Sequence, residues 1–175
     1  MIVKTGDIVV STRASTIQLA SRYVSMSAMH GEEAFEVLMG AGMRVTKGAA
    51  LTVPEPLLTR ADKERQGKLT GASVVDMESF WIAQEAERAG VPVVSVRTVL
   101  DEMEHQLPSL VADITADGGK REVYHALRAM RNPANVGTLV PLAVRSRRAV
   151  IATRDAIQTL IPILTRDAAV RAVHR

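Results

Sequence analysis

Residues 72–102 read ASVVDMESFWIAQEAERAGVPVVSVRTVLDE and carry the clearest folding signal in the chain. Two apolar runs, at residues 73–75 and 91–99, flank a segment with helical spacing, and acidic residues follow each run. This order of patterns predicts a strand, a helix and a second strand. We therefore expect a βαβ crossover, in which the two strands run in the same direction.

The expected helix has one side for the sheet and one side for water. The residues expected on the sheet are small or apolar and recur at helical spacing: Ser79, Ile82, Ala83, Ala86 and Ala89. The residues expected to face water are Gln84, Glu85, Glu87 and Arg88. Gly90 is expected to end the helix, because glycine adopts the backbone conformation of a helix C-terminus at little cost.

Acidic residues stand at the carboxyl ends of both expected strands. Asp76, Met77 and Glu78 lie where the first strand turns into the helix, and Asp101 and Glu102 follow the second strand. Open α/β sheets place their ligands at the carboxyl ends of strands. The pattern therefore predicts a ligand site that contains these residues.

These residues also carry a resemblance to a known family. The segment 75–78, Val-Asp-Met-Glu, followed by Val96, Arg97 and Asp101, resembles the signature of the nucleoside phosphorylase and nucleosidase superfamily. The separation of 23 positions between Glu78 and Asp101 is similar to that of methylthioadenosine/S-adenosylhomocysteine nucleosidases. Residues 117–119 and 131–133 are more similar to the hopanoid-associated phosphorylase branch.

The resemblance implies specific roles for the site residues. Glu78 is expected to accept hydrogen bonds from both ribose hydroxyls and to stabilise an oxocarbenium-like transition state, with Met77 against the sugar face. Asp101 is expected to protonate the departing purine. Val53 is expected in the wall of the base pocket, so the catalytic pair is Glu78 and Asp101 and the substrate-binding set is Met77, Glu78 and Val53. Leu100 departs from the pattern, which has a serine there that supports the aspartate.

Each of these residues also has an ordinary structural interpretation. Glu78 stands in the first turn of a helix, where the dipole favours an acidic residue, and Asp101 could be a helix cap. Met77 could belong to the core, and Val53 could be an ordinary strand end. Arg97 could pair with a carboxylate at the end of its strand. The conjunction of the motif with its spacing favours the functional interpretation of Glu78 and Asp101.

The resemblance implies an α/β, three-layer phosphorylase-like fold with a mixed central sheet flanked by helices. Residues 1–131 would form the C-terminal portion of that domain, and residues 132–175 a helical tail that packs on it. Residues 6–11 resemble a strand near the middle of family members, so we expect an N-terminally truncated fold. Pro141 and Pro162 are expected to kink or end the helices of the tail.

Composition limits the possible location, covalent cross-links, metal sites and partners of the chain. The chain has 175 residues, is 47% hydrophobic, and contains no apolar run long enough for a membrane span, so a cytoplasmic protein is expected. With no cysteine it forms no disulfides. Four histidines without ligand spacing predict no metal site. A net charge of +3 and 3% aromatic residues argue against nucleic acid as a partner.

The expected function is cleavage of the N-glycosidic bond of an adenine-type purine nucleoside, with phosphate or water as co-substrate and no cofactor. The alternative is a non-catalytic nucleoside-binding remnant or a truncated, inactive family member. The residues do not show whether water or phosphate attacks the sugar, and they do not specify the 5′-substituent of the nucleoside. An open sheet edge predicts a homo-oligomer.

Overall fold

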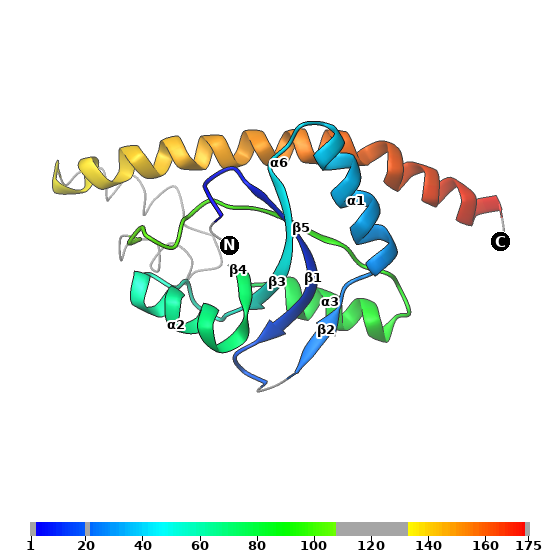
Figure 1. The fold of residues 1–175 in the computed structure, drawn as a ribbon, viewed down its shortest axis with the longest axis horizontal. Coiled ribbons are helices and arrows are strands. Elements are labelled where there is room, and N and C mark those ends of the chain that lie inside the picture. The colour runs from blue at the N-terminus through cyan, green and yellow to red at the C-terminus, as the bar shows by residue number, and fades with distance from the viewer. Residues whose placement is uncertain (1–2, 20–21, 108–132, 174–175) are drawn as a thin grey trace.

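The computed structural model describes residues 3–19, 22–107 and 133–173 (Figure 1). Its elements, in chain order, are β1 (Ile8–Thr16), β2 (Tyr23–Ser25), α1 (Ala28–Gly40), β3 (Val45–Thr52), α2 (Arg60–Thr70), β4 (Ala72–Asp76), α3 (Ser79–Arg88), β5 (Ser95–Thr98) and α6 (Pro133–Val173). The motif at residues 117–119 and residues 131–132 of the second tail motif lie outside the described residues.

The five strands form one mixed sheet. β1 lies at its centre, pairs in parallel with β3, and β3 pairs in parallel with β4. The other side of β1 is shared by two antiparallel strands, because β5 pairs with residues 8–11 and β2 with residues 13–15. This confirms the expected mixed sheet flanked by helices.

The expected βαβ crossover is wrong. β5 runs antiparallel to β1, whereas β4 runs parallel to β3 and so to β1. β4 and β5 therefore run in opposite directions, and they are separated by β1 and β3. An apolar run predicts a strand but holds no information about the direction of that strand or about its neighbour in the sheet. Both depend on which backbone N–H and C=O groups are available for pairing, and for β5 these are the groups of β1 at residues 8–11.

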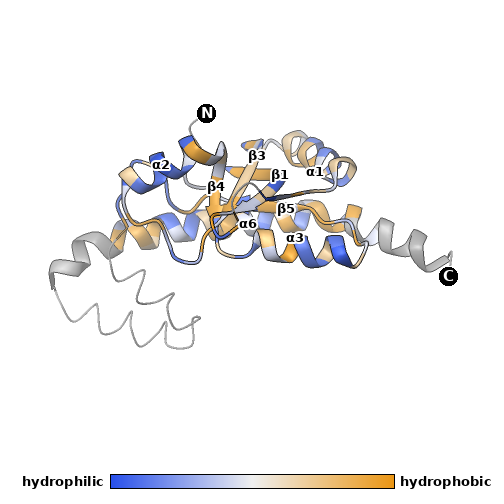
Figure 2. Ribbon diagram, turned by 90° about the horizontal axis from the view of Figure 1, so that it is seen from below, coloured by the Kyte–Doolittle hydropathy of each residue, from blue (hydrophilic) through white to orange (hydrophobic). Residues whose placement is uncertain are grey.

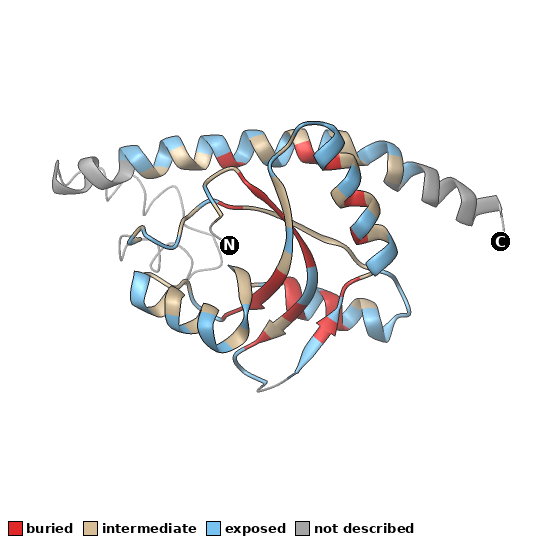
Figure 3. Cartoon of the chain, viewed as in Figure 1, coloured by how far each residue is buried: buried red, intermediate tan, exposed pale blue. Residues whose placement is uncertain are grey.

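Helices cover both faces of the sheet (Figure 2). On one face α3 closes a core cluster of Ala14, Val24, Met26, Ala50, Phe80 and Ala83. On the other face α1 and α6 close a second cluster of Ile8, Val10, Leu38 and Ala156. The buried residues concentrate along β1, β3 and the helix surfaces that face them (Figure 3).

The sheet-facing side of α3 differs in part from the expected one. Ser79 and Ala83 are buried as expected, but Phe80 and Gln84 are buried with them and Ile82 is 56% exposed. Phe80 is fully buried, and the buried side of α3 is therefore shifted by about one residue from the expected side. Gly90 follows the end of α3 with a positive φ of 66°, as expected for a glycine that ends a helix.

A single long helix, α6, forms the end of the chain. It runs through Pro141 and Pro162, so neither proline ends a helix, and of the two expected outcomes, a kink or an end, only the kink stays a prediction. Both prolines are exposed, so water can hydrate the carbonyl groups that lose their helical partner. α6 packs on the body through Ala149 and Ala156, which are buried. Among the described residues, no helix is long and apolar enough to cross a membrane.

Candidate functional site

Asp76, the last residue of β4, organises the turn into α3. Its Oδ1 atom accepts hydrogen bonds from Thr52 Oγ1 at 2.8 Å and from the backbone N–H groups of Glu78 at 3.2 Å and Ser79 at 3.0 Å. Thr52 Oγ1 in turn accepts a hydrogen bond from the backbone N–H of Phe80 at 2.9 Å. These bonds satisfy donors at the start of α3 that have no partner within the helix. They also fix the position of Glu78 relative to the sheet.

Arg97 of β5 brings a positive charge to this turn. Its Nε atom lies 3.1 Å from Asp76 Oδ2, and its Nη2 atom donates to Ser79 Oγ at 2.9 Å. The Asp76 side chain is only 8% exposed, and a buried carboxylate without a counter-charge is strongly destabilising. Arg97 Nη2 also lies 3.5 Å from Glu78 Oε2, a long contact that leaves the Glu78 side chain 59% exposed. Glu78 is therefore oriented by its neighbours but open to a ligand.

Val53 and Met77 lie beside this turn. The backbone N–H of Val53, just after β3, donates to Asp76 O at 2.8 Å. The Val53 side chain is 2% exposed and packs in the interior, whereas Met77 is half-buried. The structure thus brings Val53, Met77 and Glu78 together where β3 and β4 end, and of these three Glu78 presents the most side-chain surface.

Asp101 belongs to a second group of polar contacts. Lys63 of α2 forms an ion pair with Asp101 Oδ2 and donates to the carbonyl oxygens of Glu102 at 3.1 Å and His105 at 2.7 Å. The Lys63 and Asp101 side chains are 12% and 13% exposed. The second carboxylate oxygen, Asp101 Oδ1, is buried and has no hydrogen-bond partner among the described residues.

Glu102 joins the same segment to the N-terminal residues. Its Oε1 atom accepts hydrogen bonds from the backbone N–H of Thr5 at 3.0 Å and from Thr5 Oγ1 at 3.1 Å, and its Oε2 atom accepts one from Lys4 Nζ at 3.0 Å. The Thr5 backbone donor, followed by the Lys4 and Thr5 side chains, lowers the pKa of Glu102 to about 2 against the opposing effect of burial. Glu102 is therefore a structural carboxylate.

The two groups of polar residues are distinct. No hydrogen bond or ion pair among the described residues joins Asp101 to Glu78 or Arg97. The direction of β5 explains this separation, because its carboxyl end pairs with the beginning of β1, whereas the carboxyl end of β4 pairs with the end of β3. Arg97 and Asp101 are four positions apart in the chain, so their Cα atoms lie at most about 14 Å apart.

Sequence reasoning missed Lys63. Its partner Asp101 is 38 positions away, and its helix, α2, is mostly polar and has no buried residue. One lysine among several cations on such a helix carries no local signal. A pairing of this kind becomes visible only when the fold places the helix against the 101–105 segment.

Other candidate sites in the described part of the chain are weak. No group of three or more His, Asp or Glu residues there could hold a metal ion. A shallow, mostly apolar hollow of about 340 Å³ on α6 is lined by Val150, Thr153, Arg154, Ile157 and Gln158. Thr153 Oγ1 donates to Thr98 Oγ1 at 2.9 Å, and neighbouring strand residues point to opposite faces, so this hollow and the Arg97 side chain lie on opposite faces of the sheet.

Comparison with known proteins identifies the family. The family described as the phosphorylase superfamily matches residues 2–130. The chain belongs to this superfamily. No curated protein sequence matches this member of the phosphorylase superfamily.

Solved structures share the fold of this phosphorylase-superfamily chain. The futalosine hydrolase of Helicobacter pylori is 18% identical with a TM-score of 0.54, over 66% of this chain and 53% of that one. The 5′-methylthioadenosine/S-adenosylhomocysteine nucleosidase of Campylobacter jejuni is 16% identical with a TM-score of 0.55, over 72% of this chain and 61% of that one. The corresponding nucleosidase of Helicobacter pylori, with butyl-thio-DADMe-Immucillin-A, is 14% identical with a TM-score of 0.56, over 71% and 60%. The chain thus spans between half and two thirds of the length of these structures.

Proposed function

We propose that this phosphorylase-superfamily chain binds a purine nucleoside of the adenine type and cleaves its N-glycosidic bond. The observation that supports this most directly is the carboxylate of Glu78. It is held at the start of α3 by the Asp76 hydrogen bonds and by Arg97, yet it stays 59% exposed. A carboxylate oriented in this way can accept hydrogen bonds from two ribose hydroxyls. The nucleosidases among the similar structures support the same choice of substrate.

In the proposed reaction each site residue has one task. Glu78 binds the ribose and stabilises the positive charge that develops on it, and Met77 packs against the sugar. The bond between the sugar C1′ and the base nitrogen breaks with its electron pair going to the base. A protonated Asp101 donates its proton to N7 of the base. An oxygen of water or phosphate then bonds to C1′, and the Asp101 carboxylate recovers a proton from the attacking water or, with phosphate, from the solvent. The reaction needs no cofactor, and the backbone at Val53 borders the base.

A second function is favoured by the contact between Lys63 and Asp101. Lys63 holds one oxygen of this carboxyl group and leaves Oδ1 for a hydrogen bond with a base, and such a hydrogen bond can bind the base without transfer of a proton. The alternative is therefore a nucleoside-binding protein without turnover.

Ribose recognition by Glu78 can be measured directly. Glu78→Gln keeps the size of the side chain but removes the charge, so binding of adenosine or methylthioadenosine should weaken by about 1.5–3 kcal/mol, the range for hydrogen bonds to charged groups. Isothermal titration calorimetry measures the change. Glu87→Gln, on the exposed side of α3, is the matched control. Equal affinity of Glu78→Gln and the wild type would exclude Glu78 from the site.

Turnover separates the enzyme from the binding protein. If the chain cleaves adenosine, Asp101→Asn should lower kcat by about 10²- to 10⁴-fold, as is typical for loss of a general acid. Adenosine affinity should change much less, because the amide can still donate to N7. Leu100→Ser should raise kcat, since a hydroxyl next to Asp101 can support it. An active wild type whose activity survives Asp101→Asn would place the proton donor elsewhere, and a chain that binds without turnover would be the binding protein.

We also infer that the chain self-associates. β4 pairs on one side with β3 and with no other described strand, so its outer edge is open. α6 is also rich in exposed aliphatic side chains: Val140, Val144, Val150, Ile151, Ile157 and Ile161. Surfaces of this kind favour association between chains. Self-association and a cytoplasmic location both stay predictions.

A further inference from the structure

We propose that Lys63 is a positioning residue for Asp101, an inference that rests on the proposed function. Its ammonium group holds one carboxylate oxygen, Oδ2, and the segment that follows Asp101. The other oxygen, Oδ1, then stays in place for the proton that passes to the base. Lys63 touches neither ribose nor base in this arrangement and acts through Asp101.

The hydrogen bonds of Lys63 support a positioning role. An ammonium group has three N–H donors, and Lys63 directs them at three acceptors: Asp101 Oδ2 and the carbonyl oxygens of Glu102 and His105. A lysine with all donors engaged has little freedom to rotate, and its exposure of 12% removes most competition from water. The cation therefore fixes the carboxylate and the backbone on both sides of residues 103–104.

The surroundings of Asp101 provide little other support. Leu100 is apolar and 41% exposed, so its side chain offers Asp101 no hydrogen bond. Among the described residues, the segment beyond Asp101 is joined to α2 and to the residue Leu58 before it by the hydrogen bonds of Lys63 and by one backbone bond from Leu107 N to Leu58 O at 2.9 Å. α2 contributes no buried residue, so its position relative to Asp101 depends on polar contacts.

The unpaired oxygen indicates where the reaction partner binds. A buried carboxylate oxygen without a donor is costly, and a donor on a bound base or a proton on the oxygen would remove that cost. Asp101 Oδ1 is such an atom among the described residues, whereas Oδ2 is occupied by Lys63. The two oxygens of one carboxyl group thus have separate tasks, one structural and one chemical.

Three variants test the role of Lys63 in catalysis. Lys63→Met removes the ammonium group but keeps a long side chain, so it should lower kcat for adenosine cleavage by about 10²-fold, the loss that a misplacement of about 1 Å can cause, with a change in KM of less than about threefold. Lys63→Arg keeps the cation and should recover most of that loss. Lys68→Met, at an exposed lysine on the same helix, is the matched control and should behave as the wild type. Unchanged or increased kcat in Lys63→Met would overturn the proposal.

A second measurement tests the positioning role of Lys63 and does not require that the chain cleave adenosine. Hydrogen exchange at the backbone amides of His105 and Leu107 should become at least about tenfold faster in Lys63→Met and return toward the wild-type rate in Lys63→Arg, while exchange in β1 stays unchanged. Equal exchange in Lys63→Met and the wild type would overturn the proposal even if the chain is inactive. Failure of the proposed function is a different result: neither cleavage of adenosine nor adenosine binding that depends on Glu78.

Discussion

Each carboxylate near the candidate site meets a cation, but the remaining exposure separates their roles. Asp76 and Glu102 are 8% and 14% exposed and accept several hydrogen bonds, so they hold the backbone in place. Glu78 is 59% exposed and makes one long contact with Arg97, so its charge stays available to a ligand. Asp101 lies between these cases, because one of its oxygens is paired with Lys63 and the other is not.

Glu102 makes a pH-dependent contribution to stability. Its folded-state pKa of about 2 is below the ordinary value of 4.5, so the contribution is fully present above about pH 4.5 and is lost as the pH falls toward 2. Glu102→Gln should lower the free energy of unfolding by about 1–3 kcal/mol at pH 7, and this difference from the wild type should shrink below pH 4.5. Urea titrations at pH 7 and pH 3 measure it. Glu104→Gln, exposed in the same segment, should have little effect at either pH.

At the scale of elements, Phe80 determines how α3 sits on the sheet. It is fully buried in the cluster under α3, and it forms a T-shaped contact with Trp81 at 5.0 Å between ring centroids. Phe80→Ala should lower the free energy of unfolding by about 3–5 kcal/mol, the range for loss of a buried aromatic side chain. Ile82→Ala, at a residue that is 56% exposed, should cost less than about 1 kcal/mol. Chemical denaturation compares the two, and a larger effect at Ile82 would contradict the observed orientation of the helix.

The pairing of β3 with β4 depends on Gly48. A Cβ atom at this position would lie 2.4 Å from Ser73 Oγ and 2.5 Å from Ser73 Cβ, which is too close for the strands to keep their spacing. Gly48→Ala should therefore lower the free energy of unfolding by about 1–3 kcal/mol. Adding Ser73→Gly should recover part of the loss, because it removes the atoms that clash. Gly40→Ala, where a Cβ atom would meet nothing within 4 Å, is the control and should change the free energy of unfolding little.

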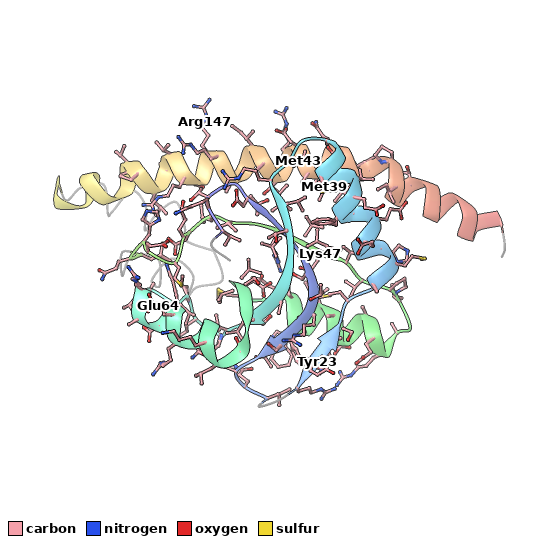
Figure 4. All side chains as sticks on the ribbon, viewed as in Figure 1. Tyr23, Met39, Met43, Lys47, Glu64 and Arg147 are labelled. Atoms are coloured by element: carbon pink, nitrogen blue, oxygen red, sulfur yellow. The ribbon has the colours of Figure 1, made fainter. Side chains whose placement is uncertain are left out.

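At the scale of the whole molecule, α6 has two different sides. Ala149 and Ala156 are buried and pack on the body, whereas Val150, Ile157 and Ile161 are exposed. Arg147 also projects from α6 away from the sheet (Figure 4). So many exposed aliphatic side chains are unusual for a surface helix.

The exposed aliphatic surface of α6 provides a test of self-association. If it forms the contact, the double variant Ile157→Lys and Ile161→Lys should shift the protein to the monomer, because two added positive charges repel between copies. Sedimentation velocity at micromolar concentration measures the change. The control is Met29→Lys in α1, because Met29 is 71% exposed and lies on a different helix. A wild type that sediments as a monomer would contradict self-association itself.

Local patterns in the sequence were sufficient for much of the fold and for the position of Glu78 in it. The alternation of apolar runs and helical spacing predicted β4, α3 and β5, Gly90 ends α3 as expected, and the motif at residues 75–78 places Glu78 at the start of a helix. These features depend on residues close together in the chain, whose spacing is written in the sequence. The role of Glu78 stays a prediction.

Tertiary structure alone determined the direction of β5, the partner of Asp101 and the continuity of α6. β5 pairs antiparallel with a strand more than 80 positions earlier, and Lys63 meets Asp101 across 38 positions. Such contacts form because the packed fold brings distant groups together, and no local pattern encodes which groups will meet. α6 likewise continues through two prolines because exposure to water and packing of Ala149 and Ala156 outweigh the local preference to end the helix.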